Sequence, residues 1–276
     1  MKRITLLFVC CFPFLSNAQF DFNPDDLTKL LDGSIESDRP GQAMNPRSCG
    51  IMTIQLQTGG SFARSTFNPN GHINSFSTPT QLKLGLTGNL ELNTSFSYIY
   101  SDYDDGFFEY QFGGFPSPSI NLRYTVLNGD KWKPYLGIQA GFTPSSSRGN
   151  FQQPQFGSSY FLLTSNRFDK LSVNTNFGVS FSGFGLGADT YVLPYVVNLG
   201  YAINSKWSVF AEAFGEARSS SLNIDGGVAY GLNSSLQLDA FGGWLGGNSW
   251  FAEIGLTWKY SFLKAMAKKK INELFK

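Results

Sequence analysis

Residues 254–262 read IGLTWKYSF, and large side chains fall on every second position. Ile254, Trp258 and Phe262 share one face of an extended chain, whereas small or polar residues such as Thr257 occupy the other. In a soluble sandwich the bulky face lines a core, while in a membrane barrel it meets lipid and the polar face looks into a lumen. The rest of the chain decides which solvent each face meets.

The composition fits a membrane barrel and argues against a helical membrane protein. Charged residues make up 15% of the 276 residues, below the roughly 25% usual in soluble domains. No run of apolar residues after the N-terminus is long enough for a spanning helix. A net charge of +1 gives no reason to expect a nucleic-acid partner.

The N-terminus has the three parts of a secretory signal peptide. Lys2 and Arg3 precede a short apolar run, and small residues end at Ala18, so we expect residues 1–18 to be removed. Of the three cysteines only Cys49 would remain, which predicts a mature chain without an internal disulfide. Residues 19–50 are expected to form a periplasmic segment that begins with a short helix.

Residues 51–262 alternate with period two and are divided by turn signals, which predicts a closed antiparallel transmembrane β-barrel. Short connections near Asn89, Gly129, Asn204 and Ser234 all fall on the rim that carries both termini if there are twelve strands. Longer connections are expected at about 60–78, 101–116 and 144–155. The predicted strands are 51–59, 79–87, 89–100, 117–127, 132–143, 156–165, 170–182, 189–203, 206–217, 220–231, 235–244 and 249–262.

The bulky faces are expected to meet outer-membrane lipid, and both termini are expected in the periplasm. The alternative is a secreted β-sandwich. The last strand, which ends in Phe262, resembles the signal that outer-membrane barrels present to the barrel-assembly machinery. That signal normally stands at the extreme C-terminus, but here a lysine-rich tail, 263–276, follows it. The tail has an amphipathic helical pattern, typical of a membrane surface or of a solvated helix.

The polar faces carry ionisable residues that are candidates to line the lumen. They are Lys83, Glu91, Arg123, Glu212, Asp225, Asp239, Glu253 and Lys259. The acids gather on the last four strands, and large inward residues such as Phe241 accompany them. These charges fit either a path for small solutes or cross-strand ion pairs that fill a tight barrel.

Signals for catalysis are weak. His72 is the only histidine, and it is expected in an outer loop, where neighbouring serines occur by chance. The sequence has no metal-ligand spacing, phosphate loop or nucleotide fingerprint, so we predict no metal site, no cofactor and no enzyme.

Two short segments resemble a known family of bacterial outer-membrane proteins. IESDRPGQA at 35–43, which contains Asp38, Arg39, Pro40 and Gly41, is similar to the DRPG-type start of the MetA-pathway of phenol degradation family. LKLGLTGNLELNTSFSY at 82–98 is similar to a strand pair of that family. The resemblance implies a transporter-like barrel that passes hydrophobic or aromatic compounds. The phenylalanine-rich composition also resembles that of the Bacteroidota, which are Gram-negative.

The DRPG segment has no period of its own and precedes the first strand. We predict that it enters the periplasmic mouth of the barrel, where Arg39 pairs with lumen acids such as Glu253 or Asp239. The alternative is a local pair of Arg39 with Glu36 or Asp38. The sequence thus favours an outer-membrane channel for passive passage of small molecules. The alternatives are a structural or ligand-binding barrel filled by side chains, and a lipid-active barrel enzyme.

Overall fold

The computed structural model describes residues 35–67, 71–130, 133–146, 150–151, 156–182, 191–219 and 221–266. The predicted signal peptide, the predicted short helix and the tail beyond residue 266 lie outside the described residues. Among those that are described, no helix is long and apolar enough to cross a membrane. Residues 262–266 form a helical turn that follows the last strand.

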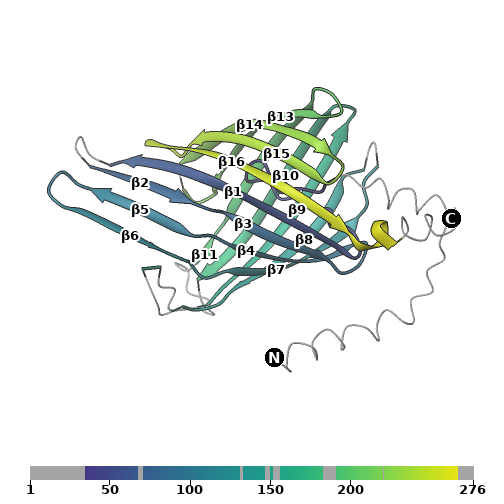
Figure 1. Cartoon of the computed structure of the whole chain (residues 1–276), viewed down its shortest axis with the longest axis horizontal. Coiled ribbons are helices and arrows are strands. Elements are labelled where there is room, and N and C mark those ends of the chain that lie inside the picture. Colours follow the sequence, from purple (N-terminus) through teal and green to yellow (C-terminus); the bar gives the residue numbers. More distant parts are fainter. Residues whose placement is uncertain are drawn as a thin grey trace. The chain divides into compact units, whose positions relative to one another are not determined.

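Twelve antiparallel strands close into a transmembrane β-barrel (Figure 1). Closure joins the first strand to the last in a continuous ladder from Thr53↔Ser261 to Thr66↔Asn248. The barrel strands are β1 (Thr53–Thr66), β3 (Thr80–Gly85), β4 (Leu90–Phe96), β7 (Ser119–Leu127), β8 (Tyr135–Thr143), β9 (Gly157–Phe168), β10 (Leu171–Ser182), β12 (Pro194–Ala202), β13 (Trp207–Glu216), β14 (Leu222–Asn233), β15 (Leu236–Trp244) and β16 (Asn248–Ser261). A two-residue strand, β11 (Tyr191–Val192), pairs with the end of β10.

The barrel wall continues beyond the twelve-strand ring as a sheet of hairpins. The second half of β1 pairs with β2 (His72–Ser77), which pairs with β5 (Ile99–Asp104), which pairs with β6 (Glu109–Gly114). The predicted long connections at about 60–78 and 101–116 are therefore wrong, because most of these residues extend neighbouring strands. The expected loop position of His72 is corrected as well, since His72 begins β2.

The apolar faces of the strands point outward and the polar faces point into the barrel. Ile254, Trp258, Tyr260 and Phe262 of the opening segment are all exposed. Lys83, by contrast, is fully buried, as are several other charged and amide side chains of the inner face. This inverted distribution is expected when lipid solvates the outside of a barrel and polar groups fill its lumen.

The connections are shortest on the rim where β1 begins and β16 ends, named here the terminal rim. β9 and β10 are separated there by only two residues, of which Asp169 has a positive φ of 55°. The opposite rim also has a tight turn, because β15 and β16 are joined by three residues. Gly246 and Gly247 adopt positive φ values in that turn, so a tight hairpin forms without strain.

Candidate functional site

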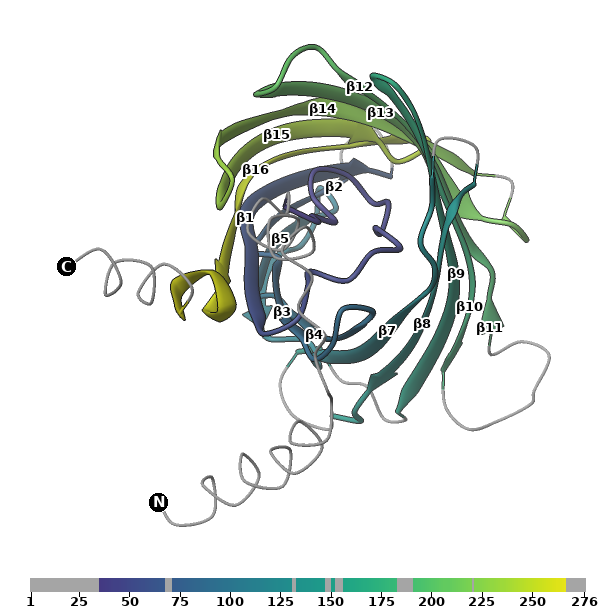
Figure 2. The same ribbon diagram turned by 90° about the vertical axis from the view of Figure 1, so that its right-hand side faces the viewer.

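Residues 35–50, named here the luminal segment, run inside the barrel before the chain enters β1. Figure 2 shows this purple segment within the ring of strands. It contains no helix or strand, so its position depends on side-chain contacts with the wall. Two adjacent residues of opposite charge, Asp38 and Arg39, provide the strongest of these contacts.

Asp38 binds the basic part of the wall, formed by β3, β4 and β7. Its carboxylate lies 2.8 Å from Lys83 Nζ and accepts two hydrogen bonds from the Arg123 guanidinium, at 2.8 and 3.0 Å. Burial alone would raise the pKa of Asp38, but the charges of Arg123 and Lys83 outweigh burial and hold that pKa well below its ordinary value. Glu91, 3.5 Å from Arg123, completes a group of two cations and two anions.

Arg39 binds the acidic part of the wall on the other side. Its guanidinium donates a 2.7 Å hydrogen bond to Asp239 of β15 and forms an ion pair with Glu253 of β16. Its Cζ also lies 5.6 Å from the centre of the Phe241 ring. The predicted pairing of Arg39 with these two acids is therefore present, and Asp38 and Arg39 together tie the segment to two distinct parts of the wall.

Two glycines make room for the Arg39 guanidinium in the wall. Gly59 of β1 and Gly255 of β16 face each other across the closing ladder. A Cβ atom on Gly255 would overlap the guanidinium, and one on Gly59 would lie 2.9 Å from its Nη2. We call this place the guanidinium slot. It exists because neither strand carries a side chain at this rung.

The backbone of the segment is held by Glu212 of β13. Its carboxylate accepts hydrogen bonds from the amides of Gln42 and Ala43, at 2.6 and 3.1 Å. Gly41 has a φ of +97°, and a Cβ there would lie 2.5 Å from Glu212. Glycine is therefore required at Gly41 both by its backbone conformation and by the close approach of the carboxylate.

Asp225 accepts no backbone hydrogen bond from the segment, although the Gln42 side chain lies next to it. It faces Glu212 across the β13–β14 ladder and is 7% exposed. Among the described residues, neither of its carboxylate oxygens has a hydrogen-bond partner. Two carboxyl groups thus stand side by side in this part of the lumen.

The remainder of the segment packs against the basic part of the wall. Glu36 pairs with Arg47 within the segment, at 2.8 Å. The Cys49 amide donates a 2.8 Å hydrogen bond to Glu91. Burial, together with the neighbouring Glu91 charge, raises the pKa of the Cys49 thiol to about 12. The thiol is therefore neutral and shielded at physiological pH.

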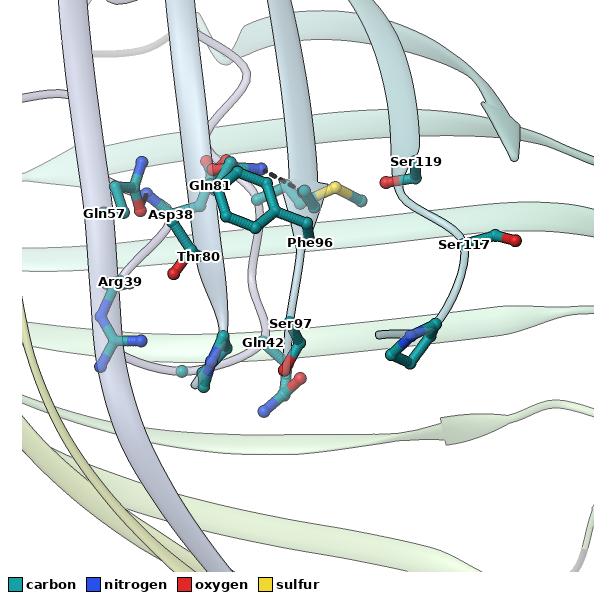
Figure 3. A pocket seen from close by; sticks show the side chains of 15 residues that line it. Asp38, Arg39, Gln42, Gln57, Thr80, Gln81, Phe96, Ser97, Ser117 and Ser119 are labelled. Atoms are coloured by element: carbon teal, nitrogen blue, oxygen red, sulfur yellow. Dashed lines mark hydrogen bonds between the residues drawn. The ribbon is translucent and has the colours of Figure 1, made fainter. Parts of the chain in front are cut away.

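Two cavities lie against opposite parts of the luminal segment. The first, of about 200 Å³, is lined near the terminal rim by Lys170 and Ser208 and is named the rim cavity. The second, of about 380 Å³, is lined by Gln57, Phe96 and Pro116 and is named the wall cavity (Figure 3). Residues 38, 39 and 44 line both cavities, so the segment forms a partition between them.

All eight charges predicted for the lumen lie on the inner face. Seven of them are described above. The eighth, Lys259, is partly buried opposite Gln55. The sequence analysis missed the uncharged part of the site. It consists of buried amide and hydroxyl side chains, namely Gln55, Gln57, Asn93, Gln139, Asn176, Asn198 and Thr257.

The structure brings no catalytic group together around His72. It lies opposite Thr66 and Asp104 in the hairpin sheet, and no described serine or carboxylate forms a hydrogen bond with it. Within the part of the chain that the structure describes, no group of three or more His, Cys, Asp or Glu side chains is arranged to hold a metal ion.

A twelve-strand barrel with an apolar exterior, a polar interior and a chain segment inside has the fold of outer-membrane β-barrel proteins. The chain is similar in structure to an outer membrane channel from Pseudomonas putida F1, with a TM-score of 0.61 and 10% sequence identity over 81% of this chain and 100% of that one. The KdgM porin aligns with a TM-score of 0.49 and 9% identity over 75% of this chain and 99% of that one. The toluene transporter TbuX from Ralstonia pickettii aligns with a TM-score of 0.41 and 10% identity over 76% of this chain and 89% of that one.

No protein-family profile matches the sequence, and no curated protein matches it. The fold is therefore shown by structural likeness alone. Membership of the MetA-pathway of phenol degradation family stays a prediction.

Proposed function

We propose that this protein is an outer-membrane channel that lets small molecules pass by passive diffusion once the luminal segment shifts. The observation that carries the proposal is the pair of cavities on opposite parts of one partition, residues 38–44. The partition is tied by ion pairs and hydrogen bonds. Such contacts can be exchanged for contacts with water, so the segment can leave its seat without unfolding the barrel.

The solutes we propose are small and hydrophobic or aromatic. The wall cavity combines Phe96, Met44 and Pro116 with hydroxyl and amide groups, a mixture typical of sites that bind small organic molecules. The resemblance of the DRPG segment to a family of aromatic-compound transporters agrees with this solute class.

We further propose that the terminal rim faces the periplasm. The short connections gather there, as they do on the periplasmic rim of outer-membrane barrels. In this orientation the last strand would be read by the barrel-assembly machinery, and the exposed ring of apolar side chains would contact outer-membrane lipid.

The second candidate is a structural or binding barrel with a permanently closed lumen. It is favoured by the complete pairing of Asp38 and Arg39, which leaves the segment firmly held. A barrel enzyme has less support, because none of the serines that the structure describes forms a hydrogen bond with His72.

Single-channel conductance in a planar bilayer tests the proposal. We expect small or rare steps from the refolded protein and larger, more frequent steps from Arg39→Gln, which loses its ion pairs with Asp239 and Glu253. Arg47→Gln is the matched control, because its partner Glu36 belongs to the segment itself and not to the wall. If neither the protein nor Arg39→Gln conducts, the closed-barrel candidate is correct.

A further inference from the structure

Three neighbouring stretches of the wall are interrupted at about the same height along the barrel. The breaks lie at 78–79 between β2 and β3, at 97–98 between β4 and β5, and at 115–118 between β6 and β7. The first two are bridged by backbone hydrogen bonds, since Gly59 N donates to Pro79 O at 3.1 Å and Thr78 N donates to Tyr98 O at 2.9 Å. The third break is different.

The ladder that joins β4 and β5 to β7 and β6 is interrupted, and it resumes with a shifted register. The last rung on one side is Ser95↔Ser119, and the first on the other is Ile99↔Gly114, so residues 96–98 face residues 115–118. Among the described residues, no backbone hydrogen bond joins these two stretches. Pro116 and Pro118 lack the N–H groups that would be needed to continue the ladder. We call this interruption the open seam.

Aromatic side chains cover the open seam in place of backbone contacts. The rings of Tyr98 and Phe115, one from each edge, meet edge to face with centroids 5.1 Å apart. Phe115 is 70% exposed, so this cover lies on the outer surface. A contact between two rings can open by side-chain rotation, whereas a paired ladder cannot.

The wall cavity reaches the open seam from inside. It is lined by inward-facing Gln57 and Gln81, but also by Thr80 and Phe96, which belong to the outward-facing set of their strands. Figure 3 shows Phe96 and Ser97 on one stretch of the chain and Ser117 and Ser119 on the next, which are the two edges of the open seam. The lining of this cavity thus includes residues from both faces of the wall at the level of the open seam.

The open seam lies at the edge of the acyl layer. β7 has 9 residues between the terminal rim and the seam, and a tilted strand needs about 9–11 residues to cross the hydrocarbon core. A molecule that leaves the cavity here would enter lipid close to the head groups and not water.

We propose that the open seam is a lateral portal, through which small apolar molecules of the size of one aromatic ring exchange between the lumen and the membrane. This inference rests on the proposed channel function and adds a route to it. The cavity of about 380 Å³ is large enough, because an apolar cavity of about 150 Å³ already accepts benzene. Its hydroxyl groups would suit a phenol-like substituent, while Phe96 and Pro116 would contact the ring.

Cysteine labelling in lipid vesicles tests the portal without any need for transport. Gln81→Cys places a thiol on the inner side of the seam, and Ser172→Cys places one in the rim cavity, away from it. We expect N-(1-pyrenyl)maleimide dissolved in the lipid to label Gln81→Cys but not Ser172→Cys. A charged methanethiosulfonate in the water should label both. The unmodified chain is the background control, because Cys49 is only 1% exposed.

A second variant closes the seam. Pro116→Val with Pro118→Val restores two N–H groups, and in the Gln81→Cys background it should abolish labelling from the lipid while labelling from water persists. If Gln81→Cys reacts only with the charged reagent, the portal does not exist and solutes can move only along the barrel axis. Labelling from lipid in a protein without conductance would keep the portal and reject the axial channel, so the two failures are distinguishable.

Discussion

At the scale of single residues, the decisive feature is the adjacency of Asp38 and Arg39. The two residues are adjacent in the chain, but each side chain binds groups of the opposite charge on different strands. At most 10% of each partner side chain is exposed, so each charge is needed by its counterpart. Removing one member of a buried ionic group leaves an unpaired charge, which costs about 3–5 kcal/mol, whereas replacing the whole group with neutral residues costs much less.

This difference predicts a non-additive result for Arg39. Arg39→Met alone should unseat the luminal segment, because Asp239 and Glu253 are left unpaired. The triple variant Arg39→Met, Asp239→Asn, Glu253→Gln should regain most of the loss. The rate at which a thiol reagent modifies Cys49 measures the unseated fraction. Equal rates in the single and triple variants would show that the ion pairs do not hold the segment.

The guanidinium slot gives a second prediction. Gly255→Ala should unseat the segment, because the new methyl group occupies the space of the Arg39 guanidinium; overpacking of this kind typically costs about 1–3 kcal/mol. Gly60→Ala is the matched control on β1, since its Cβ would meet only the Phe76 ring at 3.7 Å. Conductance should rise in the first variant and stay unchanged in the second. A silent Gly255→Ala would mean that Arg39 has another position available.

At the scale of elements, the luminal segment should respond to alkaline pH through Cys49. The thiol has a pKa of about 12 when seated and an ordinary value of about 8.5 when released. Below pH 8.5 both states hold the proton, so pH has no effect. Above it the released state loses the proton first, so each further pH unit favours release by about 1.4 kcal/mol.

The measurement is channel opening between pH 8 and pH 10. The fraction of open time should increase with pH in the native chain, and the increase should vanish in Cys49→Ala. An increase of equal size in Cys49→Ala would assign the effect to other groups, such as lysines.

The strands that cross the membrane were predictable from the sequence, and the hairpin sheet was not. A strand between lipid and lumen meets two unlike solvents, and its side chains must alternate. β2, β5 and β6 extend beyond the ring and have no such constraint, so their Ser- and Tyr-rich sequences look like loops. The same reasoning explains why the open seam escaped prediction: Pro116 and Pro118 read as the end of a loop.

The site was predictable to the extent that it is charged. A charge on a strand must face the lumen, so its location follows from the alternation alone. The amides that accompany it, such as Gln139 and Asn176, are ordinary polar-face residues, and nothing in one sequence distinguishes those that touch the segment. The binding of Asp38 by Lys83 and Arg123 was likewise missed, because contacts between the segment and the wall depend on three-dimensional register.

At the scale of the whole molecule, the lumen has a basic part and an acidic part. Five of the eight lumen charges identified above are acidic and three are basic. The paired charges of the segment, Glu36 and Asp38 against Arg39 and Arg47, cancel. The acids of β13 to β16 therefore set the sign of the field along the path.

This imbalance predicts weak selectivity for cations in the open state. Under a KCl gradient the reversal potential of Arg39→Gln channels should have the sign of a K⁺-preferring pore. Asp239→Asn should reduce it, because the Asp239 carboxylate loses its ion-pair partner when Arg39 is replaced. Gln237→Glu, on a neighbouring inner-face position, should increase it. A preference for chloride would show that the basic part of the wall dominates the path.

The guanidinium slot also has a consequence for biogenesis. Its two halves come from opposite ends of the chain, Gly59 from the first strand and Gly255 from the last. The slot cannot exist until those ends have met. Docking of Arg39 is then a late step in maturation. A lumen that is closed by the docked segment shows that the first and last strands have paired. A half-zipped precursor would remain leaky and recognisable to quality control.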